Sequence, residues 1–300
     1  MSLISIVIPL YNEEGNVPEL LRRVASIMAR VTQPGEKYEI VAVNDGSRDG
    51  TLATLRAALV SQPRLVIVDL SRNFGHQIAA TAGIETARGE FILFADDDVW
   101  LPPAFLAAHA AAQSMQTPVA VSGPILNVAG YDVRPKPSPL NYSGAFFCTC
   151  NVSIARTALL AVGGFDETFN LYGWEDTELG LRLRRSGVQR AFAWDAYLWH
   201  IKPPRVETLE SVLAKTVERA EMAARFLRKD TSLRTKLATG AYGFNFARSS
   251  LLVPGWAIER YRRLATSARA PAFVRAIARA QFLDGSYTAA LRRALAERAS

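Results

Sequence analysis

The sequence predicts an α/β fold in which helices flank a mostly parallel sheet. Short apolar runs alternate with amphipathic stretches through the first hundred residues. Continuous apolar runs of this kind are typical of parallel strands that are covered on both faces. Each run ends in a cluster of polar residues, and 49% of the 300 residues are hydrophobic, which is enough for a sizeable core.

Four strands and three helices are expected in the first hundred residues. The strands are ISIVIPL at 4–10, EIVAVND at 39–45, LVIVDL at 65–70 and FILFA at 91–95. The helices between them are expected at 16–31, 51–60 and 76–87. The first helix is indicated by apolar residues on one side, at Val17, Leu20, Leu21, Val24 and Ile27.

From residue 119 onward the pattern changes. Strands are predicted at 119–123 and 145–155, with a loop rich in Pro and Asn at 127–143 and a short helix at 156–162. A further helix starts at Asp176 and stops at Gly187, since glycine commonly ends helices. Beyond 205 the chain reads as helical throughout, and three-four spacing there is typical of a packing or dimer surface. That stripe comprises Val206, Leu209, Leu213, Thr216, Ala220, Ala223 and Leu227.

The charge distribution divides the chain near Pro203 and Pro204. Residues 1–204 carry 17 Lys+Arg and 20 Asp+Glu (17 − 20 = −3), whereas residues 205–300 carry 18 and 8 (18 − 8 = +10). We therefore expect one domain at 1–204 and a basic helical region at 205–300. A solvated basic face would account for the excess, and so would an anionic membrane surface. No nucleic-acid partner is expected.

Cysteines and hydropathy indicate the compartment. Cys148 and Cys150 form a single C-x-C, without the second pair that a structural metal site needs, and we interpret them as reduced core residues. The residues after Met1 lack the basic and small-residue pattern of a signal peptide, so none is expected here. The uncharged stretch from Val99 to Tyr131 is interrupted by prolines and glutamines and is not expected to span a membrane. These features favour a soluble cytoplasmic protein, peripheral at most on the inner face of the membrane.

Polar clusters follow all four early strands. Because the carboxyl ends of parallel strands meet at one edge of a sheet, we expect these clusters to gather there and to bind a ligand. Ordinary turns would explain each cluster alone, but they explain all four together less well. The clusters are Tyr11-Asn12-Glu13, Asn44-Asp45-Gly46-Ser47, Arg72-Asn73 with His76, and Asp96-Asp97-Asp98.

Five motifs in this order resemble the family 2 glycosyltransferases, inverting enzymes of GT-A fold that use nucleotide-sugar donors. The resemblance covers roughly residues 3–200. The motifs are SIVIPLYNEEGNV, VNDGSRDGT, SRNFGHQIAATAGIETARGEFILFADDD, GGFDE and WEDTELGLRLRRSG.

The resemblance implies a divalent metal, Mn2+ or Mg2+, at the acidic motif. Asp96 and Asp98 match the D-x-D spacing of the family. Many relatives read D-x-D-D, and in that register Asp97 is the ligand. Hard divalent ions prefer carboxylate oxygens and share them with phosphates, so the chemistry agrees. His200 lies where some relatives supply a third ligand, although a core or surface histidine would fit equally.

The resemblance also implies a nucleotide pocket. Tyr11 would stack on the base, Glu13 would accept from ribose hydroxyls and Asp45 would accept from the base. His76 and Gln77 begin a helix, which is a natural place for a phosphate contact. The residues expected to bind the donor are Pro9, Tyr11, Glu13, Asp45, Arg72, Asn73 and Asp96.

Asp176 is the expected catalytic base. In inverting transfer, one carboxylate removes the proton of an acceptor hydroxyl during a single displacement. A helix N-cap would also account for Asp176. Glu175 is placed with it in the catalytic pair, and Glu175 and Trp174 would shape the acceptor site.

These features predict transfer of a single sugar from a nucleotide sugar, with UDP as the expected nucleotide, to an acceptor hydroxyl. The Q-x-x-R-W motif of processive synthases is absent from the sequence. The acceptor is open: lipid-linked, glycan or small molecule. Two alternative functions are a sugar nucleotidyltransferase of similar fold and a nucleotide-sugar-binding module. For assembly, a homodimer is the candidate.

Overall fold

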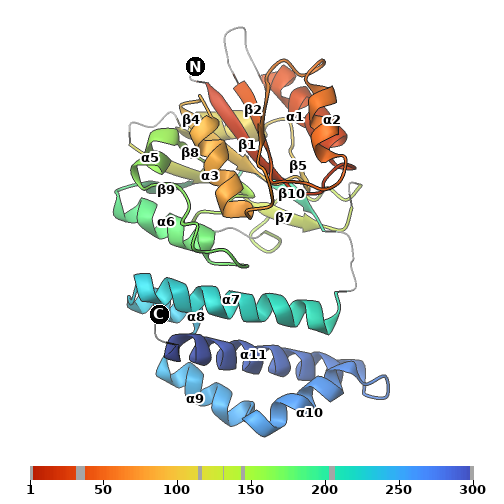
Figure 1. The fold of residues 1–300 in the computed structure, drawn as a ribbon, viewed down its shortest axis with the longest axis vertical. Helices are drawn as coiled ribbons and strands as arrows, with labels where there is room; N and C mark the ends of the chain where they lie inside the picture. Colours follow the sequence, from red (N-terminus) through yellow and green to blue (C-terminus); the bar gives the residue numbers. More distant parts are fainter. Residues whose placement is uncertain are drawn as a thin grey trace. The chain divides into compact units, whose positions relative to one another are not determined.

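A computed structural model describes residues 3–31, 38–113, 117–130, 132–142, 146–202 and 207–297. The chain forms two compact units, and Figure 1 shows the elements of each. The first unit comprises Met1–Thr168 with Glu175–Arg205, and the second comprises Phe169–Trp174 with Val206–Ser300. The expected boundary at Pro203 and Pro204 lies outside the described residues.

The first unit is built on a seven-stranded sheet of order β3-β2-β1-β4-β8-β6-β9. The strands β1 to β4 are all parallel, whereas β8 runs antiparallel to both β4 and β6. Their bounds are β1 Ile4–Leu10, β2 Tyr38–Asn44, β3 Leu65–Asp69, β4 Phe91–Ala95, β6 Val119–Ser122, β8 Asn151–Ala155 and β9 Gln189–Phe192. The sequence therefore predicted the parallel half of this sheet to within a residue.

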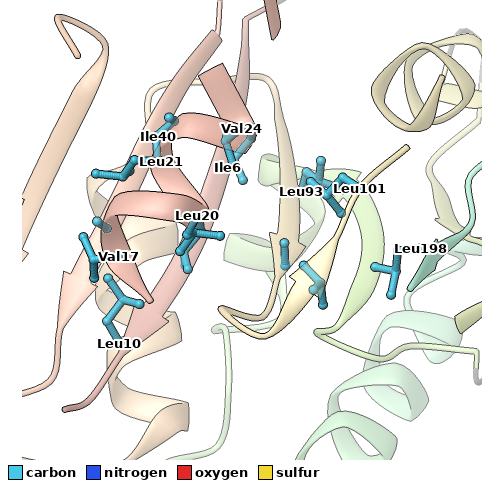
Figure 2. Packing of buried hydrophobic residues seen from close by; sticks show 14 of the residues in the cluster. Ile6, Leu10, Val17, Leu20, Leu21, Val24, Ile40, Leu93, Leu101 and Leu198 are labelled. Carbon is cyan, nitrogen blue, oxygen red and sulfur yellow. The ribbon is translucent and has the colours of Figure 1, made fainter. Parts of the chain in front are cut away.

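Helices cover both faces of the sheet, as the sequence predicted. On β1, Ile6 and Ile8 face one side and pack against α1 (Val17–Val31), while Val7 faces the other. Figure 2 shows Leu20 and Leu21 of α1 lying against this strand. The remaining helices of the first unit are α2 Thr51–Ala58, α3 His76–Thr86, α4 Phe105–Gln113, α5 Arg156–Ala161 and α6 Glu175–Arg185.

A second, three-stranded sheet of order β5-β10-β7 was not predicted. It consists of β5 Val99–Trp100, β7 Ile125–Val128 and β10 Leu198–Ile201. β10 pairs antiparallel with β5 and places His200 opposite Val99. This pairing brings His200 beside the acidic motif, from about a hundred residues away along the chain.

The strand predicted at 145–155 is shorter than expected. β8 begins only at Asn151, and Phe146 to Cys150 form bends and turns, while residue 145 lies outside the described residues. Both cysteines are free, as predicted, with Cys150 buried and Cys148 partly buried in the core. Turning at this point lets the cysteine segment follow the end of β4 instead of continuing as a strand.

A buried polar network joins α4 to β8. His109 Nε2 lies 2.9 Å from Asn151 Oδ1, and its Nδ1 lies 2.9 Å from Ser153 Oγ. The amide nitrogen of Asn151 donates hydrogen bonds to the backbone carbonyls of Pro124 and Ala196. Its Oδ1 therefore accepts from Nε2–H, and Nδ1 accepts from the serine hydroxyl. Every member of the network is satisfied by a neutral imidazole.

Replacing His109 with alanine is expected to destabilise the first unit by about 2–4 kcal/mol, because it opens a cavity and leaves buried acceptors and donors without partners. Urea denaturation followed by fluorescence measures the change. Ala107→Ser, at an exposed position on the same helix, is the control and should shift stability by less than about 0.5 kcal/mol. If both variants lowered the free energy of unfolding equally, the network would not be a main source of stability in the first unit.

The same residue makes stability depend on pH. Burial lowers the pKa of His109 to about 4, well below the 6.5 of a free imidazole. Below pH 6.5 the unfolded chain therefore binds a proton that the folded chain refuses. This contribution, about 3 kcal/mol, is present above pH 6.5 and is lost as the pH falls towards 4. Denaturation at pH 7 and pH 5 should show the loss in the native chain and a flatter profile in His109→Ala.

The second unit is helical, as predicted for the region beyond 205. The predicted apolar stripe lies on α7, where Ala220, Ala223 and Leu227 pack against Leu291 of α11. The C-terminal half of the stripe is thus covered within the chain and is not a dimer surface, while Val206 lies outside the described residues. The helices are α7 Leu209–Lys229, α8 Leu233–Thr239, α9 Gly243–Leu252, α10 Gly255–Thr266 and α11 Ala272–Ala296. Within the described ranges, no helix has the length and hydropathy to cross a bilayer.

Candidate active site

The acidic motif lies directly after β4, at the edge of the sheet where a parallel fold binds ligands. Asp98 Oδ1 lies 2.9 Å from His200 Nε2, and its Oδ2 lies 3.9 Å from Lys202 Nζ. Asp96 and His200 each offer a ligand atom within 4.8 Å of the other. His200 therefore lies close to both Asp96 and Asp98, two of the three acids predicted to bind metal.

Asp97 points to a different partner. Burial, followed by the neighbouring Glu13, raises the pKa of Asp97 to about 8. Asp97 is consequently protonated for the most part at neutral pH. Glu13 Oε2 also accepts from the Asn16 amide at 2.6 Å. Of the two registers considered, this geometry favours Asp96 and Asp98 over Asp97.

Electrostatics at the motif favour a cation. Burial raises the pKa of Asp96, and the neighbouring Asp98 raises it further, while the nearby His76 and His200 act in the opposite direction. Ionised carboxylates this close repel one another unless positive charge lies between them. Two carboxylates and an imidazole are a donor set that holds Mn2+ or Mg2+, so the residues present fit such an ion.

The loop after β2 is locked to the loop after β3. Asp45 is buried, and its two oxygens accept from the backbone N–H groups of Phe74 and Gly75 at 2.8 and 2.9 Å. Gly46 has φ 62, and a Cβ there would lie 2.1 Å from the carbonyl carbon of Arg72. Only glycine combines that conformation with that approach. Asp45 thus organises the loop, and base binding would use its remaining lone pairs.

The other predicted nucleotide residues lie along the same edge. Pro9 pairs with Val43 near the end of β1, and Tyr11 is exposed just beyond it. Arg72 and Asn73 are both exposed, with the Arg72 guanidinium 4.4 Å above the ring of Phe74. The first residue of α3 is His76, and Gln77 beside it is buried. Four separate strand ends therefore supply one surface.

Asp176 lies at the start of α6. Its Oδ2 accepts from the Thr149 backbone N–H at 3.1 Å and from the Thr149 hydroxyl at 3.4 Å. Asp176 Oδ1 and Glu175 Oε2 are closed to solvent and find no hydrogen-bond partner in the described ranges. Burial, followed by the neighbouring Glu175, raises the pKa of Asp176 to about 7, although the Thr149 bonds act in the opposite direction. An acceptor oxygen poised in this way suits proton transfer near neutral pH.

Trp174 belongs to the second unit. Its indole N–H donates to the backbone oxygen of Arg219 at 2.9 Å, and its ring lies 6.0 Å from that of Phe226. The residue has φ 76, which is uncommon for a bulky side chain. These contacts give Trp174 a packing role, and its predicted contact with an acceptor stays a prediction.

Cys150 is the residue that sequence reasoning missed. Its sulfur lies with Asp96 and His200 in a cluster whose ligand atoms are all within 4.8 Å of one another. The sequence shows the C-x-C, but a single cysteine pair does not indicate a metal site. Only the turn before β8 brings this thiol to the end of β4.

Comparison with known proteins gives two family matches. Residues 5–159 match the family described as glycosyl transferase family 2, which is more than half of the chain. Residues 133–222 match a family described as the N-terminal domain of galactosyltransferase.

Curated relatives are similar over the first part of the chain. An uncharacterized glycosyltransferase of Bacillus subtilis is 46% identical over 99 residues, covering 33% of this chain and 30% of that protein. An undecaprenyl-phosphate 4-deoxy-4-formamido-L-arabinose transferase of Aeromonas hydrophila is 42% identical over 104 residues, covering 34% and 31%. The matched segment thus spans under a third of the length of these relatives.

Solved structures share the fold. A mannosyltransferase of Pyrobaculum calidifontis, in complex with GDP-Man and Mn2+, has a TM-score of 0.63 at 17% identity, over 100% of this chain and 88% of its own. TarS of S. aureus (residues 1–349), in complex with UDP-GlcNAc, has a TM-score of 0.57 at 20% identity, over 97% and 91%. At these identities the likeness concerns the fold.

Proposed function

The chain belongs to glycosyl transferase family 2 and has the GT-A fold, and we propose that it moves a single sugar from a UDP-sugar to an acceptor hydroxyl with inversion. The observation that carries this proposal is the pairing of two features in the first unit. Asp96, Asp98 and His200 converge after β4, and Asp176 presents a buried, unpartnered oxygen at the start of α6.

A divalent cation is the proposed cofactor. Asp96, Asp98 and His200 would hold Mn2+ or Mg2+, which when bound supplies positive charge against the departing diphosphate. Lys202 beside Asp98 adds a second cation at the same edge. The raised pKa of Asp96 supports this proposal, because the carboxylates gain most from a nearby positive charge when they are buried.

The donor nucleotide is proposed to lie across the loops after β1, β2 and β3. Pro9, Tyr11, Arg72 and Asn73 flank that surface, and Asp45 fixes the loop that carries the last two. Tyr11 is exposed and free to stack on a base. Glu13 is proposed to contact the ribose, and the raised pKa of the neighbouring Asp97 limits the negative charge at this corner.

Asp176 is proposed to act as the general base, with Glu175 beside it. The Thr149 backbone N–H donates to Oδ2 of Asp176 and so fixes the orientation of the carboxyl. Oδ1 has no hydrogen-bond partner among the described residues. A pKa of about 7 leaves an appreciable fraction of Asp176 ionised at neutral pH and gives it the proton affinity a base needs. The acceptor is proposed to be lipid-linked, since the Aeromonas relative is named as an undecaprenyl-phosphate transferase.

Calorimetric titration with UDP-, GDP- and dTDP-sugars tests the donor proposal. We expect one UDP-sugar to bind in the presence of Mn2+ and to lose most of its affinity in EDTA. Binding of a GDP-sugar in its place would reassign the nucleotide. Folded, metal-loaded protein that binds no nucleotide sugar would overturn the proposal.

The second unit turns an apolar helix face outward. On α9, Phe244, Ala247 and Leu251 recur at helical spacing, and all three are exposed. On the other side of α9, Phe246 packs against the apolar cluster of α7 and α11, and Arg248 pairs with Asp284 at 2.8 Å. Exposed apolar side chains gathered on one helix face mark protein or membrane interaction sites.

Trp256 of α10 is a further exposed aromatic residue of the second unit. It is 70% exposed, and the Arg260 guanidinium carbon lies 4.9 Å from its ring centroid. Residues 243–297 contain nine arginines and three acids (9 − 3 = +6). Aromatic residues flanked by arginine suit the headgroup region of an anionic bilayer. We propose that the surface formed by Phe244, Leu251 and Trp256 docks on such a membrane.

Sedimentation with vesicles of phosphatidylcholine and phosphatidylserine at low salt tests the docking surface. The double variant Leu251→Ser/Trp256→Ser should weaken binding more than about tenfold, since each buried apolar side chain contributes about 1.5–3 kcal/mol. Val60→Ser is the control, because Val60 is 94% exposed in the first unit. Native protein that does not sediment would overturn docking. Native protein that is dimeric by light scattering, and monomeric as the double variant, would make the face a self-association surface instead.

A further inference from the structure

The acidic motif is joined by a sulfur donor. Cys150 is buried, and its sulfur lies beside the carboxyl of Asp96. One ligand atom from each of Asp96, Cys150 and His200 lies within 4.8 Å of the other two. The three residues come from separate elements, since Asp96 follows β4, Cys150 precedes β8 and His200 belongs to β10. The cluster therefore depends on the tertiary fold and not on one short stretch of sequence.

This donor set differs from the one that Mn2+ or Mg2+ requires. Those ions prefer oxygen ligands, which Asp96 and Asp98 supply without help from sulfur. A thiolate combined with an imidazole and a carboxylate favours Zn2+ or Co2+, which bind softer ligands in tetrahedral sites. The second cysteine does not share this arrangement. Cys148 lies instead beside Asp176, whose carboxyl is among the causes that raise the Cys148 pKa to about 12, after burial.

We propose that Asp96, Cys150 and His200 form a binding site for a thiophilic divalent cation of the Zn2+ class. On binding, the Cys150 thiol releases its proton to solvent and a metal–sulfur bond forms, with no change of oxidation state. The cation withdraws Asp96 and His200 from the arrangement used for Mn2+. Zn2+ is therefore an inhibitor of the transferase, and this consequence rests on the proposed function, whereas binding itself does not.

Absorption spectroscopy of the metal-free, full-length protein titrated with Co2+ tests binding without any sugar donor. Native protein and Cys148→Ser should both show a thiolate-to-cobalt charge-transfer band in the near ultraviolet, and Cys150→Ser should show none. Added Zn2+ should displace the band. A native protein without the band, or a band lost in Cys148→Ser and kept in Cys150→Ser, would overturn the assignment.

Competition with a chromogenic chelator gives a second readout. Replacing a ligand should weaken Zn2+ binding at least as much as loss of an outer partner does, by about tenfold or more in Cys150→Ser and in His200→Ala. Equal Zn2+ affinity in native protein and both variants would overturn the site, and circular dichroism checks that the variants fold. A negative cobalt spectrum in a protein that binds a nucleotide sugar with Mn2+ removes this inference alone. A positive spectrum in a protein that binds no nucleotide sugar removes the transferase proposal and keeps the metal site.

Discussion

Replacing Asp176 with asparagine is expected to lower kcat by about 10²–10⁴-fold while leaving the donor Kd nearly unchanged. Asparagine keeps the size of the side chain and can still accept from Thr149, but it cannot take a proton. The free Oδ1 of Asp176 is the oxygen that the proposed reaction uses. Steady-state kinetics with the donor identified by titration, together with calorimetric donor binding, separate the two effects. Asp195→Asn, at an exposed acid of the same unit, is the control and should retain native activity.

A loss below about tenfold would argue strongly against a base at Asp176. It would also be informative about the acceptor. A lipid phosphate is already ionised near neutral pH and needs no base to attack, whereas a hydroxyl does. A small effect of Asp176→Asn alongside transfer to a polyprenyl phosphate would therefore replace the hydroxyl acceptor with a phosphate.

The pH profile follows from the same residue. Because burial raises the pKa of Asp176 to about 7, the carboxyl is protonated and inactive as a base at pH 5. Activity should therefore rise with pH through about 7 and level off above it. A profile flat from pH 5 to 8 would contradict the role of Asp176, and the rising limb should be absent from the residual activity of Asp176→Asn.

Replacing Asp98 with asparagine is expected to weaken Mn2+ binding by about 100-fold or more, since even outer-shell partners of metal ligands contribute 10–100-fold. Turnover at limiting Mn2+ should fall accordingly and recover in part at high Mn2+. Asp97→Asn is the matched control on the neighbouring residue. Because Asp97 lies beside Glu13 and has a pKa raised to about 8, replacing its carboxyl with an amide should preserve metal binding. The opposite order of effects would assign the metal to the register that contains Asp97.

The parallel half of the sheet could be predicted because each strand carries its own signal. β1 to β4 are short apolar runs flanked by turn residues, and β4 was predicted without error at Phe91–Ala95. The small sheet could not be predicted in the same way. β5 has two residues and β10 has four, so their pairing rests on contacts distant in sequence. Register between such short strands is not encoded in a local pattern.

In the candidate site too, features with a local sequence signal could be predicted, and those that depend on tertiary contacts could not. Polar residues after each strand predicted which side chains gather at the edge, because the fold fixes where strands end. The sequence pattern did not predict which residue each of these side chains would contact. Both oxygens of Asp45 accept hydrogen bonds from a neighbouring loop, and Asp97 lies beside Glu13. Cys150 joins the metal cluster through a turn that the sequence predicted as part of a strand. These outcomes depend on how two loops pack, which the residue spacing does not contain.

Anomalous scattering at the manganese edge, from crystals grown with Mn2+ and UDP, tests the central claim most directly. We expect one strong peak within coordination distance of the Asp98 carboxylate and the His200 imidazole, with the diphosphate on its open side. A peak bound to other residues, or UDP held at the strand ends without metal, would contradict a metal-dependent transferase built on Asp96, Asp98 and His200.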